Sequence, residues 1–246
     1  MKYFYLFIIY FTISGNPSKK ELTANEIINT SITNSGAFKI ANSKITFKFR
    51  DKEYAALRKD GNFKLFRNYV KDSIAIDEVL TNDGYERLIN GQAVKIADAM
   101  VSKYSNAINS VHYFSVLPYG LNDNAVRKKL LPSSTIKGKG YYKIEITFSE
   151  NGGGEDFEDV FIYWIGKEDF LIDYLAYSYH TNGGGKRFRV LKEQCNKNGI
   201  RFVDYHNYKP LTKSNSLINI DKAFENNQLK KVSEIILEDI KVEILD

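Results

Sequence analysis

Residues 140–148 read GYYKIEITF, residues 160–165 read VFIYWI, and residues 171–180 read LIDYLAYSYH. In the first segment apolar residues alternate with polar ones, which is the period of a half-buried strand. The second is a continuous apolar run, which predicts a strand covered on both faces. The loops between these segments leave no room for crossover helices, so we expect an antiparallel sheet.

More strands are predicted on both sides of this region. Asp60-Gly61-Asn62 is a hairpin signal between two upstream strand candidates. Apolar residues recur among polar ones from Val232 to Leu245, which predicts one final strand. The remaining strand candidates are Lys44–Phe49, Tyr54–Arg58, Phe63–Val70, Lys186–Lys192 and Ile200–Tyr208.

Helices are predicted mainly in the first half of the chain. Thr23 and Glu26 have the spacing of a capping box, which indicates a short helix over Thr23–Thr33. Apolar residues at steps of three and four predict one long helix over Ala93–Phe114. We also expect a short helix over Ala125–Leu130, and a short helix or loop insertion over Asp221–Leu229.

The N-terminus has the layout of a secretory signal peptide. A basic start precedes eleven apolar residues, YFYLFIIYFTI (residues 3–13), and a small, helix-breaking segment follows. The apolar run is shorter than the roughly 20 residues that span a bilayer; a buried strand or a short membrane anchor is the alternative. We therefore predict a signal peptide over residues 1–20, cleaved near residues 14–20, and a single domain over residues 21–246.

No cysteine follows the apolar run, so we expect no lipid anchor and a soluble monomer in the periplasm or outside the cell. Cys195 is the single cysteine, which excludes an intramolecular disulfide. It is either a reactive thiol or a packed small residue, and we favour the packed residue because no histidine lies nearby in the sequence. The net charge of +5 is spread along the chain, which argues against nucleic-acid binding.

Three arginines are candidate ligand-binding residues. Arg187 and Arg189 are two positions apart on a predicted strand and share a face, and Arg201 starts the next strand. Three guanidinium groups together can hold a carboxylate or a phosphate. The alternative is a solvated sheet face, or cross-strand pairs with acidic neighbours.

Large aromatic residues are the best indication of a binding function. Trp164, Tyr174 and Tyr177, with Tyr163 and Tyr179, place amphipathic surfaces on one predicted sheet. Such rings line apolar pockets, and their hydroxyl groups orient ligands. An ordinary core is the equally weighted alternative.

The histidines do not define a metal or catalytic site. His112, His180 and His206 lack the i, i+4 spacing of metal ligands, and the chain contains no GxSxG nucleophile elbow. We therefore predict no cofactor, no metal and no assigned catalytic residue.

Three stretches resemble the signature segments of a family of exported bacterial proteins of unknown function. They are residues 116–123 (VLPYGLND), 180–189 (HTNGGGKRFR) and 199–205 (GIRFVDY). The resemblance implies an α+β fold similar to the lipoprotein carriers LolA and LolB: a strongly curved, open antiparallel sheet, or half-barrel, with helices on its concave side. Some members are labelled deoxyribose-phosphate aldolase, but that enzyme is a (β/α)8 barrel, and this chain lacks its alternating strands and helices.

The resemblance and the aromatic strands together lead to the hypothesis of an exported protein that binds a lipid, an acyl chain or another apolar small molecule. The candidate ligand-binding residues are His112, Tyr119, Trp164, Tyr174, Tyr177, His180, Arg187, Arg189 and Arg201. One alternative is an exported hydrolase-type enzyme that uses His112, His180 and Asp123 or Asp204 around Tyr119. Another is a protein that interacts with cell-envelope partners.

Overall fold

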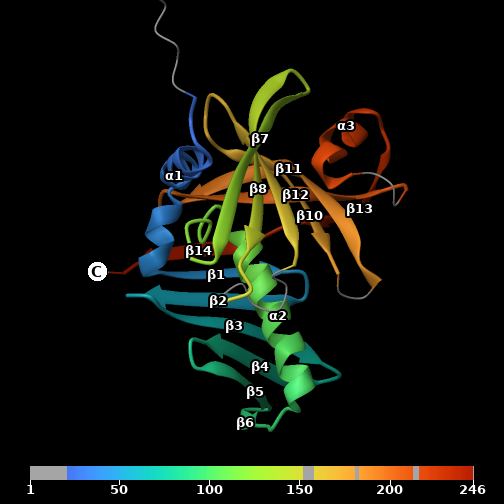
Figure 1. The fold of residues 1–246 in the computed structure, drawn as a ribbon. Helices are drawn as coiled ribbons and strands as arrows, with labels where there is room; N and C mark the ends of the chain where they lie inside the picture. The colour runs from blue at the N-terminus through green and yellow to red at the C-terminus, as the bar shows by residue number, and fades with distance from the viewer. Residues whose placement is uncertain (1–20, 152–157, 181–182, 213–215, 246) are drawn as a thin grey trace, which may run out of the picture.

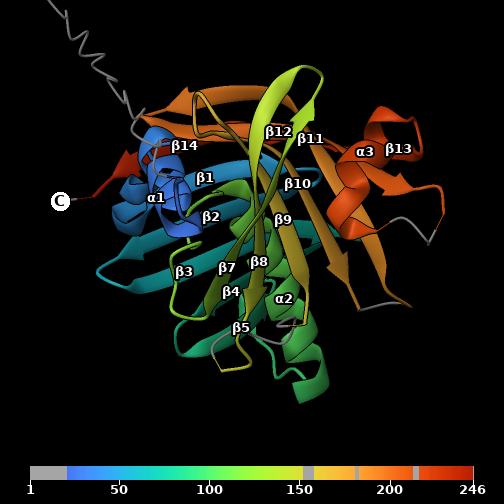
Figure 2. The same cartoon turned by 45° about the horizontal axis from the view of Figure 1, so that its top comes forward.

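The computed structural model describes residues 21–151, 158–180, 183–212 and 216–245, and its strands form two antiparallel sheets. Figures 1 and 2 show these sheets curving around helix α2 (Asp98–Ser115) as an open wall that does not close into a barrel. The predicted α+β fold with a curved, open, antiparallel wall is thus confirmed, with the strands divided between two sheets. The predicted signal peptide, residues 1–20, lies outside the described residues.

The first sheet is a meander with one strand added from the far end of the chain. Its order is β14-β1-β2-β3-β4-β5-β6. The turn at Asp60-Gly61 joins β2 to β3 as predicted, with Lys59 paired to Asn62. The strands are β1 (Ser43–Phe49), β2 (Lys52–Lys59), β3 (Asn62–Lys71), β4 (Ile74–Thr81), β5 (Gly84–Ile89), β6 (Gln92–Ala93) and β14 (Glu238–Ile244).

The second sheet contains the segments that predicted the fold. Its order is β13-β12-β11-β10-β9-β8-β7, so neighbours in sequence are neighbours in space. Every position of β9 after Val160 is buried, which confirms a strand covered on both faces. The strands are β7 (Val126–Ile136), β8 (Lys139–Phe148), β9 (Val160–Gly166), β10 (Ile172–Tyr179), β11 (Gly185–Lys197), β12 (Ile200–Pro210) and β13 (Leu229–Ile235).

The C-terminal segment joins the two sheets. The prediction of one final strand over Val232–Leu245 is wrong, because the chain forms β13 in the second sheet and β14 in the first. The change occurs at Leu237, whose backbone N–H donates to the Asp204 carboxylate (2.9 Å), and at Asp239, which has a positive φ of 54°. The last strand therefore closes the edge of β1.

Side chains on the two faces of the second sheet enter separate hydrophobic clusters. On β9, Phe161, Tyr163 and Ile165 belong to the cluster that contacts α1 and α2. Ile162 and Trp164 point the other way, into a cluster covered by α3 (Ile220–Glu225). This alternation follows from the two-residue period of a strand.

Helix α1 (Ala24–Asn34) begins at the predicted capping box. The Glu26 backbone N–H donates to the Thr23 hydroxyl (3.2 Å), and the Thr23 backbone N–H donates to the Glu26 carboxylate (2.7 Å). Ile27 and Ile28 are fully buried, as their inward positions predict. The short 3-10 helix η1 (Ala37–Asn42) then leads into β1.

Gly36 lets the end of α1 touch the second sheet. It has a φ of +70°, and a Cβ atom there would lie 1.8 Å from the carbonyl oxygen of Gly199. The adjacent Arg201 backbone N–H donates to the Ser35 carbonyl (2.9 Å). Only glycine fits this conformation and this approach.

Two of the other helix predictions need correction. Helix α2 begins at Asp98 rather than Ala93, because Gln92 and Ala93 pair with β5 and the Val94 N–H donates to the Arg87 carbonyl. The helix predicted over Ala125–Leu130 is wrong, since this segment opens the edge strand β7, whose lysines are partly or fully exposed.

The predicted helix within Asp221–Leu229 exists as α3, preceded by the 3-10 helix η3 (Leu217–Asn219). Its position differs from the expectation that the helices lie on the concave side. Helices α1 and α2 lie on that side, whereas α3 packs on the opposite face of the second sheet. Ile220 of α3 is fully buried there.

Candidate functional site

Helix α2 lies across the inner face of the first sheet and is only partly covered. Ile108 is its one fully buried apolar residue, and it packs on Ala56 and Leu65. The apolar residues Met100, Val101, Tyr104 and Val111 on the same helix are only partly buried. An amphipathic helix normally buries its whole apolar stripe. The stripe of α2 therefore retains accessible apolar surface inside the curved wall.

The C-terminal end of α2 meets the second sheet at a group of five rings, Tyr113, Phe114, Phe148, Phe161 and Tyr177, here called the aromatic cluster. Phe114 lies 5.2 Å from Tyr177 and 6.0 Å from Phe161 between ring centroids. Phe161 is nearly buried, whereas the other four rings are partly exposed. Aromatic surface of this kind, left incompletely covered, favours an apolar ligand.

Arg189 lies against the aromatic cluster. Its guanidinium carbon is 3.8 Å from the centroid of Phe114 and 5.3 Å from that of Tyr177, and its Nη2 donates to the Tyr177 hydroxyl (3.3 Å). Its Nε is buried without a hydrogen-bond partner among the described residues. The electron-rich faces of these rings attract the positive charge of Arg189, and this attraction offsets part of the free-energy cost of burying its guanidinium group.

Two buried hydroxyl groups connect α2 to β9. The hydroxyl oxygens of Tyr113 and Tyr163 are 2.9 Å apart. Burial raises the pKa of both phenols well above the ordinary value, so they stay neutral at physiological pH. This pair fixes the end of α2 beside the aromatic cluster.

A charged network covers the part of the first sheet beneath the N-terminal half of α2. Arg67 Nε donates to the fully buried Glu78 carboxylate (2.6 Å), and the Tyr85 hydroxyl donates to its other oxygen (2.7 Å). Arg87 lies 3.5 Å from Glu78 and stacks over the Tyr104 ring of α2 at 4.5 Å. Glu78 thereby orders the strands beneath the helix.

His112 is buried between α2 and the first sheet, edge-on to Phe47 and Tyr54. Its Nε2–H donates to the Phe66 carbonyl (3.1 Å), and Nδ1 has no partner among the described residues. Burial lowers the pKa of this imidazole to about 3, and the nearby Arg58 and Arg67 add to the effect. His112 is therefore a neutral residue of the interior.

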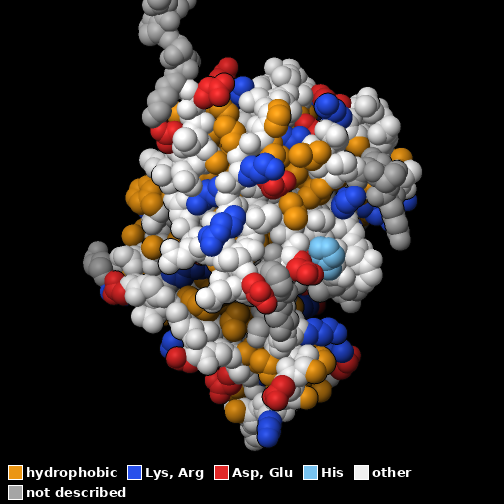
Figure 3. Space-filling model, viewed as in Figure 1, with side chains coloured by type: hydrophobic (Ala, Val, Ile, Leu, Met, Phe, Trp, Pro, Cys, Tyr) orange, Lys and Arg blue, Asp and Glu red, His pale blue; other side chains and the backbone are white. Residues whose placement is uncertain are grey.

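Arg58 and Tyr119 form a second polar position on the inner face of the first sheet. The Arg58 side chain is buried on β2, with its guanidinium carbon 5.5 Å from the centroid of the Tyr119 ring. Tyr119 follows α2 and is partly exposed. Figure 3 shows hydrophobic side chains at the floor of a hollow in the middle of the face viewed there, beside α2.

The three predicted arginines do not converge. Arg189 pairs with Asn207 across β11 and β12, whereas Arg201 pairs with Asn196, seven residues farther along β11. At about 3.3 Å per residue this separates them by roughly 23 Å. Arg201 instead contacts Asp173, Gln194 and the Ile172 carbonyl. Arg187 stacks over Tyr179 at 5.2 Å and remains on the face of Arg189.

The predicted aromatic residues also divide between the two faces of the sheet. Tyr177 belongs to the aromatic cluster, whereas Trp164 and Tyr174 lie beneath α3. Trp164 is fully buried, and its indole N–H donates to Ser134 (3.0 Å) and to Asp221 (3.3 Å). Lys143 pairs with the same carboxylate at 3.3 Å. Trp164 and Tyr174 therefore have the contacts of ordinary core residues, which was the alternative interpretation of the aromatic strands.

His180 lies apart from His112. Its side chain is exposed at the end of β10, with Nδ1 3.5 Å from the Asp159 carboxylate. His112 instead contacts strands of the first sheet. Within the described residues, no group of three or more His, Cys, Asp or Glu side chains has the geometry of a metal site.

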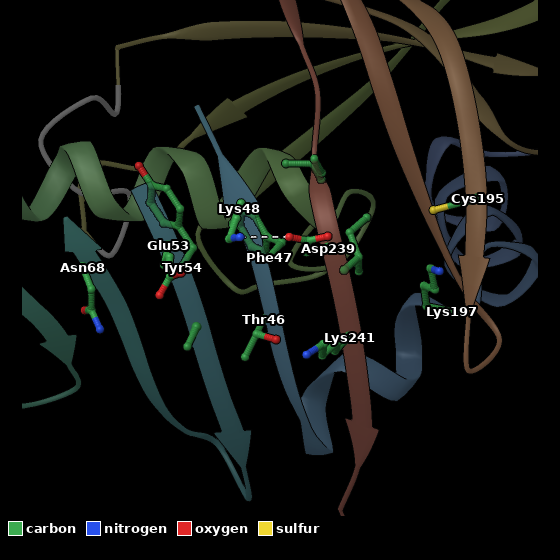
Figure 4. A pocket seen from close by; sticks show the side chains of 13 residues that line it. Thr46, Phe47, Lys48, Glu53, Tyr54, Asn68, Cys195, Lys197, Asp239 and Lys241 are labelled. Carbon is green, nitrogen blue, oxygen red and sulfur yellow. Dashed lines mark ion pairs between the residues drawn. The ribbon is translucent and has the colours of Figure 1, made fainter. Parts of the chain in front are cut away.

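A depression of about 860 Å³ lies on the outer face of the first sheet (Figure 4). Polar side chains surround it, and Lys48 pairs with Asp239 across β1 and β14 at 3.0 Å. Cys195 borders it and is exposed, so the preferred prediction of a packed cysteine is wrong. This polar surface does not suit an apolar ligand.

Sequence reasoning missed three residues of the inner surface. Phe114 and Phe161 are in segments read only as a helix face and an apolar run, and Arg58 was placed at the end of a strand without a role. A signal for Arg58 exists in the alternation of β2, where it follows the buried Tyr54 and Ala56 at two-residue steps. An arginine on the buried face of a strand needs an explanation.

Comparison with known proteins gives a family and a fold. Residues 2–238 match the model of a family of unknown function, DUF6503. No curated protein matches the sequence. Among the described residues, none of the helices has the length and hydrophobicity of a membrane-spanning segment.

Solved structures with a similar fold include a LolA superfamily protein from Nitrosomonas europaea, with a TM-score of 0.51, 12% identity, and coverage of 92% of this chain and 96% of that one. A second is a DUF1329 family protein from Desulfovibrio piger, with a TM-score of 0.44, 9% identity, and coverage of 90% of this chain and 93% of that one. A third is a domain assigned to outer membrane lipoprotein sorting from Vibrio parahaemolyticus, with a TM-score of 0.47, 9% identity, and coverage of 90% of this chain and 94% of that one. The first likeness shows that the fold is LolA-like.

Proposed function

The chain belongs to the DUF6503 family of unknown function, and from that premise we propose that it is an exported protein that binds a lipid or another acyl chain. In this proposal the acyl chain of the ligand lies between α2 and the second sheet, against the aromatic cluster. Its signal-peptide-like N-terminus supports export, and its LolA-like fold supports a binding role rather than a catalytic one.

The observation that carries the proposal is the incomplete burial of the apolar face of α2 beside the aromatic cluster. Four rings of that cluster and the apolar residues Met100, Val101, Tyr104 and Val111 stay partly accessible inside the wall. An acyl chain that covers them removes apolar surface from water on both partners. Burial of one methylene gains about 0.8 kcal/mol, so ten methylenes gain about 8 kcal/mol before the cost of association.

The attachment of α2 is also consistent with an opening motion. The buried contacts that fix the helix are in its C-terminal half, where Ile108 and His112 are buried and the Tyr113 hydroxyl is paired with that of Tyr163. No residue of positions 98–106 is buried. A helix with few buried apolar contacts opens at low free-energy cost. Movement of its N-terminal half lets a chain enter along the inner face of the first sheet.

Lipid extraction tests the proposal. Protein purified from its native host should yield acyl lipid by mass spectrometry, and the delipidated protein should bind a fluorescent fatty acid that oleate displaces. The variant Phe114→Ala, which removes a central ring of the aromatic cluster, should weaken binding by about tenfold. Phe38→Ala, at a ring that is 57% exposed on η1, is the matched control and should bind as the parent does.

Protein that is consistently empty and takes up no fatty acid would contradict the proposal. Equal effects of Phe114→Ala and Phe38→Ala would place the ligand away from the aromatic cluster.

A further inference from the structure

The buried arginines of the described residues differ in how their charge is compensated. Four of them are at least nine-tenths buried: Arg58, Arg67, Arg189 and Arg201. Arg67 pairs with Glu78, and Arg201 pairs with Asp173. Arg189 lies on the face of Phe114 and donates to a tyrosine hydroxyl. Arg58 has neither an ion pair nor a hydrogen bond with any described residue.

The surroundings of Arg58 offer no anion. It is 7% exposed, and its Nη1 is buried without a hydrogen-bond partner. The nearest ring, that of Tyr119, is 5.5 Å from the guanidinium carbon, a distance that gives a weak cation–π contact. Arg67 is also a cation, and His112 is neutral. The Asp123 carboxylate acts on Tyr119 and not on Arg58.

An unpaired guanidinium in this position is costly. Arginine does not lose its proton in proteins, so burial leaves a full charge without a counter-ion. Burial lowers the pKa of Arg58 below its usual range, which reflects the same cost, and no carboxylate offsets it. A hydrophobic residue of similar length on β2 would avoid this cost, so a ligand that brings its own negative charge explains the arginine better than packing does.

We propose that Arg58 binds the anionic head group, a carboxylate or a phosphate, of the amphiphile whose chain lies along α2. This inference rests on the proposed function and names the class of its ligand. The Tyr119 hydroxyl, which has no hydrogen bond to a described residue, is available as a second donor beside the guanidinium. Burial raises the pKa of Tyr119, so its hydroxyl keeps its proton. Guanidinium groups bind both carboxylates and phosphates through paired N–H donors.

Three ligands with the same chain and different head groups test the assignment. Oleate, oleoyl lysophosphatidate and the neutral oleyl alcohol are titrated into the delipidated full chain, and dissociation constants are measured by displacement of a fluorescent fatty acid. The parent protein should prefer at least one anionic ligand over oleyl alcohol by about tenfold or more, because a charged hydrogen bond is lost with the alcohol. The stronger of the two anions distinguishes a carboxylate site from a phosphate site.

Arg58→Met should abolish this preference and leave the affinity for oleyl alcohol unchanged. Its melting temperature without ligand should equal or exceed that of the parent, because the variant removes an uncompensated buried charge. Lys44→Met, which removes a cation from an exposed position on the adjacent strand β1, is the matched control and should retain the preference.

The outcomes separate the two proposals. If no ligand binds to the parent, the proposed function fails, and this inference fails with it. If all three ligands bind equally well, or if Arg58→Met keeps the preference, only the head-group assignment fails. An Arg58→Met protein that melts at a lower temperature and binds all three ligands more weakly has lost a structural residue, which also overturns the assignment.

Discussion

His112 makes the stability of this fold depend on pH in a predictable way. Its Nε2–H donates to the Phe66 carbonyl, so a second proton would go to Nδ1, which is buried without a partner and near two guanidinium groups. The folded protein therefore resists protonation of His112, with a pKa of about 3 against about 6.5 in the unfolded chain. We expect acid to destabilise the fold through this residue.

The magnitude follows from the two pKa values. A group whose pKa is depressed by folding contributes its full stability above the unfolded pKa and loses it as the pH falls toward the folded pKa. Each pH unit in that window is worth about 1.36 kcal/mol. Because pH 4.5 lies about two units below the unfolded pKa, His112 accounts for a loss of about 2.7 kcal/mol between pH 8 and pH 4.5.

Urea unfolding of the parent and of His112→Gln at both pH values measures this loss. Other titrating groups contribute to both proteins and cancel in the double difference. The fall in unfolding free energy should be about 2.7 kcal/mol smaller in the variant. An equal pH dependence in the two proteins would refute the reasoning, as would an NMR titration in which the His112 ring protonates near pH 6.5 in the folded state.

Two further substitutions test the fold around the site. Glu78→Gln removes the negative charge that lies 2.6 Å from Arg67 and 3.5 Å from Arg87. The unfolding free energy should therefore fall by about 3–5 kcal/mol, and a loss below about 1 kcal/mol in urea would contradict a buried ion pair. Gly36→Ala forces a Cβ atom to within 1.8 Å of the Gly199 carbonyl oxygen and should cost more than about 3 kcal/mol. Gly61 has a similar φ of +79° with nothing within 4 Å of an added Cβ atom, so Gly61→Ala is the control and should cost about 1–2 kcal/mol. Both variants are measured by urea unfolding, and equal losses would show that the contact at Gly36 is unimportant.

Local signals predicted the elements that depend on local chemistry. The capping box of Thr23 and Glu26 gave the start of α1, because both hydrogen bonds join residues three apart. The Asp60-Gly61 turn gave the β2–β3 hairpin, since positive φ at both positions is encoded by those residue types. The apolar run Val160–Ile165 gave a strand that is covered on both faces, because a strand exposed on one face would carry polar residues at every second position.

Sheet membership was beyond the reach of such signals. The segment from Val232 to Val242 loses its alternation at Ile235-Ile236-Leu237 and at Glu238-Asp239, where the chain passes from one sheet to the other, but a break in the period does not show which sheet each part joins. The prediction of a helix where the edge strand β7 begins was wrong for a related reason. Its lysines at positions 128 and 129 are typical of an edge strand and of an exposed helix face alike.

The candidate site was predicted less completely than the fold. Arg189 and Tyr177 were chosen as ligand-binding residues, and the structure brings them together against Phe114. Arg201 was grouped with them because it starts the next strand, but the register of a long hairpin places it at the opposite end. Arg58 gained a role only when the partners of every buried arginine were known.

Photo-crosslinking with a fatty acid that carries a diazirine near its methyl end tests the central claim most directly. Peptide mass spectrometry of the irradiated complex should locate the adducts on Tyr113 and Phe114 of α2 and on Phe161 and Tyr177 of the second sheet, and an excess of oleate should remove them. Adducts confined to the outer depression around Lys48 and Cys195, or none above background, would contradict the account.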